Sequence, residues 1–424
     1  MGKDNILVKR YFLAFSSAVI MLLLFSYQKA QAQSIDILLK GGHVIDPRNN
    51  IDTKMDVAIA GGKILQVAPD IPVKNAKRVV NVSGMYVTPG IIDMHVHAWY
   101  TGPVGVQTDA FSFRAGVTTV VDQGTAGWRN FREFKTSIID RSQTRVLAFL
   151  NIIGVGMIGR YEEQNVMEMN PIMTSLMITR LFPDLIVGIK APHYWGDFTQ
   201  VDSAVRAGNL AKVPVLVDFG EHIPPNSIEA LFMKHLRPGD IFTHTYAYHP
   251  YNRESVIDEN GKVKPFIFEA QKRGIIFETG HGGGAFTWTA AVPSVKQGFI
   301  TDVISTDLHT QSMNGGAKDM ANVMSKYLAM GLPLQDVIKR STVNPADVIK
   351  RPELGNLSVG SEADVAVFTL KQGNFGFLDI RNVKLEGTQK LEAELTIRAG
   401  RVVWDLNGIA APVFNPEAKP TPRP

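Results

Sequence analysis

Two histidines separated by one residue are the first feature of this sequence that could carry chemistry. An apolar run, Ile91-Ile92, leads through Asp93 to His95 and His97. In a β-strand, residues i and i+2 point to the same face, so both imidazoles would converge on one point. Neutral imidazole is the commonest protein ligand for divalent first-row metals. The pair therefore predicts two ligands of a metal site at the end of a strand.

Three further polar side chains follow apolar segments that are typical of buried parallel strands. Lys190 follows "DLIVGI", His244 lies in "GDIFTHTY" and Asp307 ends "DVISTD". A lysine in this position either reaches to solvent or, as a neutral amine, captures carbon dioxide to become a carbamate that can bridge two metal ions. The order His-x-His, Lys, His, Asp favours a metal-dependent hydrolase.

That order, with those strand contexts, resembles the amidohydrolase superfamily, metal-dependent hydrolases on a (β/α)8 barrel. The segments "VVNVSGMYVTPGIIDMHVH" and "LGNLSVGSEADVAVFTL" look like the opening and closing parts of the dihydroorotase, hydantoinase and D-aminoacylase branch. Within it, "VVDQGTAGWRNF", "VGIKAPHY", "LRPGDIFTHTY" and "GHGGGAF" are similar to a group called amidohydrolase/deacetylase. The resemblance implies a binuclear metal centre, most often zinc, that hydrolyses amides or esters.

The resemblance also implies a role for each ligand. His95, His97 and Asp307 would hold the buried metal, a carboxylated Lys190 would bridge, and His244 would help to hold the more exposed metal. Asp307 would in addition accept a proton from the metal-bridging hydroxide and pass it to the leaving group, and family analogy favours both of its roles.

One expected ligand departs from the family pattern. Where a histidine usually follows the fifth strand, this chain reads "VPVLVDFGEH", which places Asp218 there, with His222 four residues later as the alternative. An aspartate makes the site harder and richer in oxygen, which shifts the preference from zinc towards manganese or iron.

The substrate pocket is expected in the loops at the C-terminal face of the barrel. His281 is flanked by glycines that allow close backbone approach, so it could donate to a substrate carbonyl or carboxylate, or it could brace its own loop. Histidines 43, 235, 249 and 309 are expected to be structural or exposed. The loops also nominate Thr125, Trp128, Asn151, His193 and Tyr194.

The expected reaction is hydrolysis of a linear amide or ester, such as an N-acyl amino acid or a small acetylated carboxylic acid. Ala98-Trp99-Tyr100 stand where dihydroorotases usually carry an arginine, and Lys190 argues against mononuclear deaminase chemistry. A cyclic amidase of hydantoinase or dihydroorotase type, a dipeptidase, and a degenerate noncatalytic ligand-binding barrel remain alternatives.

Length and composition suit an α/β protein with two domains. The chain has 424 residues, of which 45% are hydrophobic, enough for a barrel of about 250 residues beside a smaller domain. Both ends alternate apolar with small or polar residues around Gly-Gly turns, as hairpins do. We therefore expect a small β-sandwich of residues 33–88 and 352–408, a barrel of residues 89–351 and a Pro-rich tail of residues 409–424.

The first 32 residues are predicted to be a signal peptide. Lys3, Lys9 and Arg10 precede an apolar run that is shorter than the roughly 20 residues of a membrane span, and Ala30-Gln31-Ala32 follows. An exported, periplasmic protein without a stable membrane span is expected. The absence of cysteine excludes disulfides and thiolate ligands. A net charge of +4 without a basic cluster argues against nucleic acid and leaves a small molecule as partner, while a homo-oligomer stays open.

Overall fold

The computed structural model describes residues 34–416, apart from 101, 103, 160–161, 195–196, 219, 221–226 and 250–253. The predicted signal peptide, the end of the Pro-rich tail and His222 lie outside the described residues. Among those that are described, no helix has both the length and the apolar character that crossing a membrane requires.

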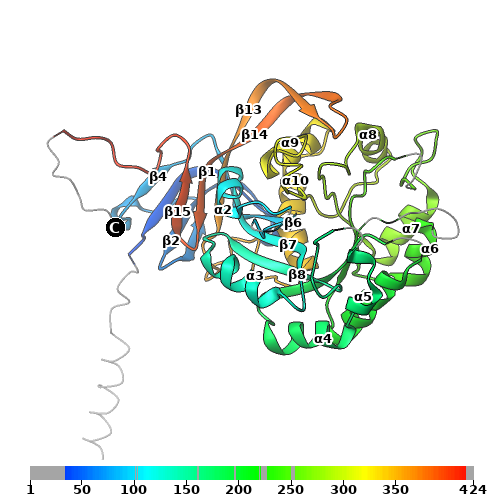
Figure 1. Cartoon of the computed structure of the whole chain (residues 1–424). Coiled ribbons are helices and arrows are strands. Elements are labelled where there is room, and N and C mark those ends of the chain that lie inside the picture. The colour runs from blue at the N-terminus through cyan, green and yellow to red at the C-terminus, as the bar shows by residue number, and fades with distance from the viewer. Residues whose placement is uncertain are drawn as a thin grey trace, which may run out of the picture.

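A curled sheet of parallel strands forms the larger part of the molecule (Figure 1). Isolated parallel bridges join Glu278 to Val303 and Val96 to Leu308, so the segment 303–308 contacts both edges of this sheet. Its seven strands follow one another in sequence order: β6 (Ile91–Val96), β7 (Val117–Gly127), β8 (Arg145–Asn151), β9 (Ile186–Ala191), β10 (Val215–Val217), β11 (Ile241–Phe242) and β12 (Ile276–Phe277).

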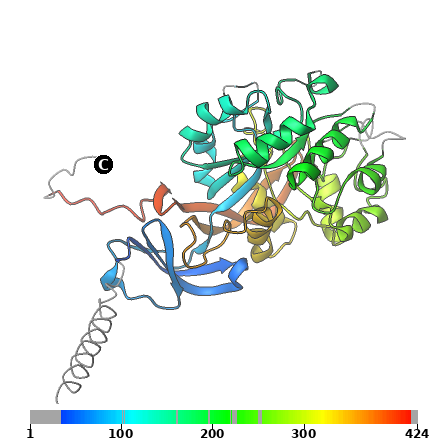
Figure 2. The same cartoon turned by 90° about the horizontal axis from the view of Figure 1, so that it is seen from below.

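Helices connect successive strands and surround this sheet (Figures 1 and 2). Proline occupies the first turn of α4 and of α7, where no intrahelical N–H bond is lost, and Gly274 ends α7 with φ 99°. The helices are α2 (Thr108–Phe111), α3 (Phe131–Ser137), α4 (Pro171–Leu176), α5 (Thr199–Ala211), α6 (Ile228–Ala230), α7 (Pro265–Arg273), α8 (Trp288–Lys296), α9 (Met320–Ala329), α10 (Leu334–Ser341) and α11 (Val343–Val348).

Strands from both ends of the sequence form a second, mixed sheet, which confirms that the two ends fold together. They join in one hydrogen-bonded order, β15-β14-β13-β5-β1-β2-β3, with β4 paired to β1. The strands are β1 (Ile37–Asp46), β2 (Ile51–Ala60), β3 (Lys63–Ala68), β4 (Val79–Asn81), β5 (Tyr86–Pro89), β13 (Val365–Leu378), β14 (Lys384–Arg398) and β15 (Arg401–Asp405).

The hairpin of β13 and β14 joins the two parts of the molecule. Its near half pairs with β5 through Val365 to Phe368, and its far half lies against α9 (Figure 1). Phe377 and Leu391 of the far half belong to the same buried cluster as the helices around the parallel sheet. The residue boundaries of the two domains stay a prediction.

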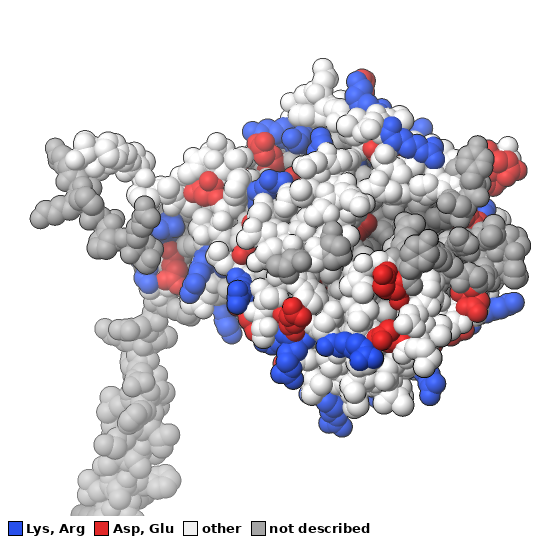
Figure 3. Space-filling model, in the orientation of Figure 1, with Lys and Arg blue, Asp and Glu red and all other residues white. Residues whose placement is uncertain are grey.

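Apolar side chains fill the inside of the curled sheet. Ile92, Met94, Leu147, Phe149 and Leu216 belong to one buried cluster there. The proposed ligands lie at or just after the carboxyl ends of the strands. On the face drawn in Figure 3, Lys and Arg are scattered among Asp and Glu instead of forming one basic surface.

Candidate metal centre

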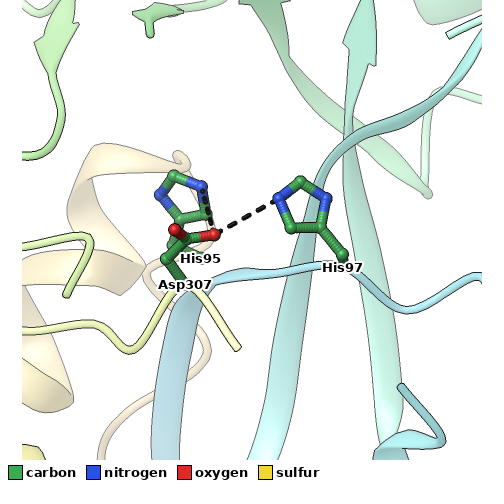
Figure 4. A group of neighbouring side chains, drawn as sticks. All are labelled: His95, His97 and Asp307. Atoms are coloured by element: carbon green, nitrogen blue, oxygen red, sulfur yellow. Dashed lines mark ion pairs between the residues drawn. The ribbon is translucent and has the colours of Figure 1, made fainter. Parts of the chain in front are cut away.

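His95, His97 and Asp307 converge at the carboxyl end of the parallel sheet (Figure 4). Asp307 Oδ1 lies 3.4 Å from His95 Nε2 and 3.3 Å from His97 Nε2. One ligand atom from each residue lies within 4.8 Å of the others, and all three side chains are buried. Two imidazoles and a carboxylate in this arrangement match the ligand types and spacing of a divalent metal site.

The backbone that presents Asp307 is held in place by neighbouring side chains. Asp93 accepts hydrogen bonds from Thr306 N at 3.0 Å and from Thr306 Oγ1 at 2.6 Å. Asp307 itself has φ 49°, and a Cβ at Gly282 would lie 2.2 Å from its Oδ2. The strained backbone and the required glycine are typical of a functional site.

Each histidine is oriented by a group behind it, as metal-binding histidines usually are. Thr125 Oγ1 donates to Asp122 Oδ2 at 2.7 Å, so it must accept from Nδ1 of His97, 3.0 Å away. His244 Nδ1 donates to the carbonyl of Gly280 at 2.7 Å. In both rings the proton is therefore on Nδ1, which leaves Nε2 as the metal-binding atom.

Lys190, Asp218 and His244 form a second cluster beside the first. Asp218 lies between the other two, with Oδ2 at 2.7 Å from Lys190 Nζ and Oδ1 at 3.1 Å from His244 Nε2. The rings of His95 and His244 are 5.2 Å apart, which joins the two clusters. The structure thus brings together the six predicted ligands, and Asp218 lies between Lys190 and His244.

The charges of this cluster control the protonation of Asp218. Burial alone would raise the pKa of its carboxyl group, but Lys190, His193 and His244 lower that pKa well below its usual range. Asp218 is therefore a carboxylate in the metal-free protein, which is the form that ligates a metal.

These residues fit a divalent metal ion. Burial lowers the pKa of His95 well below its usual value, so the ring stays neutral, and its buried Nε2 has no hydrogen-bond partner among the described residues. Lys190 Nζ makes no hydrogen bond of acceptable geometry within the same part of the chain, although it is close to Asp218. Buried polar nitrogen atoms that make no hydrogen bond, within a cluster of histidines and carboxylates, are expected where a metal binds.

A cavity of about 400 Å³ opens over both clusters. It contains Gly283, Gly284 and Ala285 from the predicted glycine-rich loop, which confirms that this loop faces the cavity. The remaining lining residues are His97, Val104, Met157, Ile158, Gly159, Glu163, His193, Asp218, His244, Asp307, His309 and Gln311.

His193 is the one residue of the predicted substrate-binding set that lines the cavity. Its Nδ1 lies 2.8 Å from Glu163 Oε2, and its Nε2 lies 3.9 Å from Asp218 Oδ1. Burial alone would lower the pKa of His193, but Asp218 and Glu163 raise it above its usual value. A histidine held in this way offers an N–H to a group in the cavity. His309, expected to be structural, also lines the cavity, 3.8 Å from Asp307 Oδ2.

The other predicted substrate-binding residues lie behind the cavity wall. Thr125 belongs to the long strand β7 and supports His97. Asn151 ends β8 and is fully buried. Its amide donates to the carbonyl of Gly124 and accepts from the backbone N–H of Ile153, so both of its polar atoms are used within the wall. Trp128 donates to the carbonyl of Glu168, and Tyr194 is buried against Phe198.

His281 is also turned away from the cavity, against the expectation that it binds substrate. It stacks on Phe286 with ring centres 4.5 Å apart and contacts Nζ of Lys326 in α9. Burial, followed by the charge of Lys326, lowers the pKa of His281 well below its usual value. The histidine therefore braces its loop, and the neighbouring glycines face the cavity.

Sequence reasoning missed three buried acids. Asp122 supports Thr125, Glu163 supports His193, and Glu278 contacts His95. Asp122 in "VVDQG" and Glu278 in "IIFETG" each follow an apolar strand, which is the signal that identified Lys190 and Asp307. Glu163 lies in a loop without such a signal.

Comparison with known proteins agrees with this geometry. The profile of the amidohydrolase family matches residues 287–403. A deacetylase of Agrobacterium fabrum is 32% identical over 329 residues, which are 74% of this chain and 78% of the relative. A deacetylase of Enterococcus faecalis is 28% identical over 384 residues, 87% of this chain and 98% of the relative.

Solved structures extend the likeness over most of the fold. The crystal structure of an adenine deaminase superposes with a TM-score of 0.80 at 26% identity and covers 88% of this chain and 100% of that one. A dihydroorotase structure has a TM-score of 0.75 at 27% identity, with 87% and 99% covered. With the sequence identity to the deacetylases, these likenesses show that the chain belongs to the amidohydrolase family of hydrolytic enzymes.

Proposed function

We propose that this protein is a binuclear metal-dependent deacetylase that hydrolyses a linear amide or ester bond. Its substrate would be an N-acyl amino acid or a small acetylated carboxylic acid. The observation that carries the proposal is the meeting of His95, His97 and Asp307 with Lys190, Asp218 and His244 beneath one cavity. The frame would be a closed (β/α)8 barrel in which residues 303–308 form the eighth strand, beside a β-sandwich made from both ends of the chain.

The residues divide between two metal ions. His95, His97 and Asp307 would hold one, Asp218 and His244 the other, and Lys190 would bridge them as a carbamate. When bound, the ions would lower the pKa of a water molecule and polarise the substrate carbonyl. Zinc is the expected metal, and the oxygen of Asp218 raises the preference for manganese or iron.

Asp307 is suited to move the proton. Burial alone would raise the pKa of its carboxyl group, but the imidazoles of His95, His97 and His244 lower that pKa below its usual range. The group is therefore ionised before reaction and can accept a proton from the attacking water. It would then deliver the proton to the leaving nitrogen or oxygen, as a general base that becomes a general acid.

The cavity wall would orient the substrate. The N–H of His193, fixed by Glu163, faces the same cavity as Asp218. Gly283 and Gly284 of the glycine-rich loop also line this cavity. Met157, Ile158 and Val104 supply apolar surface for a side chain. A molecule with one polar end and a small apolar group fits this lining.

A cyclic amidase is the second candidate, because several dihydroorotases are also similar to the chain. One from Citrifermentans bemidjiense is 44% identical, but over 63 residues, 15% of this chain. The deacetylase relatives match over much longer stretches, so linear substrates are favoured.

We further propose that residues 1–32 direct export to the periplasm and are removed there. The partner of the mature protein would be its small-molecule substrate. A homo-oligomer stays open, and size-exclusion chromatography with light scattering would measure the number of subunits.

A substrate panel tests the proposed function. The purified protein, reconstituted with zinc or manganese in the presence of bicarbonate, is offered N-acetyl amino acids of both configurations, O-acetyl hydroxy acids, hydantoins and dihydroorotate. Hydrolysis of a linear acetyl compound, with none by a matched D307N variant, is the expected result. Hydrolysis of the cyclic compounds alone would favour the second candidate. A metal-loaded protein without turnover on any compound would favour the noncatalytic binding barrel.

A further inference from the structure

Glu278 is a fully buried carboxylate that lies directly behind the proposed metal ligands. It follows β12 and does not line the cavity. Its Oε2 lies 3.2 Å from His95 Nδ1 and accepts a short hydrogen bond from Thr243 Oγ1, while Oε1 accepts another from Ser305 Oγ. The side chain therefore has a structural partner on each of three neighbouring segments.

Each of these segments carries a proposed ligand. His95 is itself a ligand, Thr243 immediately precedes His244, and Ser305 lies two residues before Asp307. The backbone adds to the connection, because the carbonyl of Glu278 accepts from Thr245 Oγ1 at 2.9 Å. One carboxylate thus links the strand ends that supply three of the six ligands.

The chemistry of His95 requires an acceptor at this place. A neutral imidazole that binds a metal through Nε2 carries its proton on Nδ1, and that N–H needs a partner when it is buried. A carboxylate in this position fixes the tautomer and the ring orientation and makes the imidazole a stronger ligand.

Packing alone does not explain a carboxylate here. Glu278 contacts three polar partners, because Thr243 and Ser305 each donate to one of its oxygens and His95 Nδ1 lies 3.2 Å from Oε2. A glutamine of the same shape would offer these partners one oxygen in place of two and no charge. The negative charge of Glu278 would stabilise a metal cation bound by the neighbouring His95.

We propose that Glu278 is a positioning residue of the metal centre, which holds His95 with Nε2 towards Asp307 and sets the spacing of His244 and Asp307 through Thr243 and Ser305. This inference rests on the proposed metal-dependent function. It predicts that the loss of Glu278 weakens metal binding even though Glu278 touches neither substrate nor metal.

The test is zinc affinity, measured on metal-free protein by competition with a chromogenic chelator. We expect E278A to bind zinc about 10- to 100-fold more weakly than the unsubstituted protein. E278Q, which keeps an oxygen acceptor for His95 but removes the charge, is expected to show a smaller loss. The visible spectrum of the cobalt-loaded protein should shift in E278A, because the His95 ring is no longer held.

Asp302 supplies the matched control. It is a partly buried acid that accepts from the backbone N–H of Phe277 at 2.9 Å, next to Glu278, and it contacts none of the proposed ligands. D302N should therefore lose stability without losing zinc affinity. If E278A does not fold, E278Q carries the same comparison.

The outcomes separate the two proposals. Zinc affinity within twofold of the unsubstituted protein and an unchanged cobalt spectrum in the folded E278 variants would overturn the role of Glu278 and leave the function intact. An unsubstituted protein that binds neither zinc, manganese nor iron would overturn both. Equal loss of zinc affinity in D302N would show that the effect is one of general stability and would also overturn the role of Glu278.

Discussion

At the scale of the residue, the site is defined as much by the groups behind the ligands as by the ligands themselves. His97 is backed by Thr125 and Asp122, and His244 by the carbonyl of Gly280. These contacts fix which ring nitrogen is available before any metal arrives. Since the supporting groups are buried and both His97 and His244 line the cavity, the geometry of these two ligands is set by the fold and is ready for binding.

Asp307 tests the proton-transfer role at this scale. D307N keeps a side-chain oxygen for the metal but removes the base, so most metal binding should remain while kcat falls by at least about 100-fold. Steady-state kinetics with parallel metal analysis measures both quantities. Full turnover in the D307N protein would show that another group moves the proton.

Lys190 tests the bridging role. K190A should lose the bridge between the two metal ions and most activity, because the carbamate that Lys190 would supply is then missing. A short carboxylic acid such as propionate, added to the buffer, should restore part of the activity by occupying the same place. Undiminished activity of K190A without added acid would exclude a bridging lysine.

At the scale of the element, the ligands at the strand ends could be predicted from sequence, whereas most of the substrate-binding side chains could not. An apolar segment that ends in a polar residue identified His95, Lys190, Asp218, His244 and Asp307, and the structure brings them together. The period of a parallel strand decides where such a side chain points, and no long-range contact is needed to work it out.

Several side chains predicted to face the cavity do not face it, because tertiary contacts decide the direction of a side chain near a loop. Thr125 lies inside the long strand β7, and His281 turns away to Lys326. Glu278 was missed because its proposed positioning role depends on contacts with three separate segments. A single sequence does not show that these segments lie together. At the two ends of the chain, the alternating pattern predicted strands that fold together, and β13 pairs with β5 in one mixed sheet.

Lys326 ties several elements together and gives a prediction at this scale. From α9 its Nζ donates to the carbonyls of Gly316 and Leu378 and contacts His281. K326M removes the donor from one buried and one partly buried carbonyl, so the free energy of unfolding should fall by about 1–3 kcal/mol. Urea unfolding at constant pH measures the change.

The same substitution should alter the dependence of stability on pH. Burial lowers the pKa of Lys326 to about 7 in the folded protein, against 10.5 for the unperturbed group. Between these values the unfolded chain binds more protons, so this residue makes the stability rise with pH above 7. The stability difference between the original protein and K326M should therefore be larger at pH 9 than at pH 7. An equal difference at both pH values would contradict the low pKa.

At the scale of the whole molecule, the two sheets have different structural roles. The curled parallel sheet presents the ligands at one end, and the β13–β14 hairpin of the mixed sheet reaches across to α9, which supports the glycine-rich loop through Lys326 (Figure 1). The second part is therefore expected to stabilise the cavity wall as well as to join the ends of the chain.

Metal removal should destabilise the whole chain. An ion that binds only the folded state stabilises it by about 2.7 kcal/mol at 100 times its dissociation constant. Dialysis against a chelator should lower Tm, and zinc or manganese should restore it. Calcium, which prefers more oxygen ligands, is the control that should not. A Tm that is the same with and without chelator would contradict tight metal binding.

The most direct measurement of the central claim is the metal content per chain by elemental analysis, on protein purified with bicarbonate and without chelator. We expect close to two equivalents, one held with His95 and the other with His244. One equivalent would show that Asp218 does not complete a second site. No bound metal, even after reconstitution, would contradict the account.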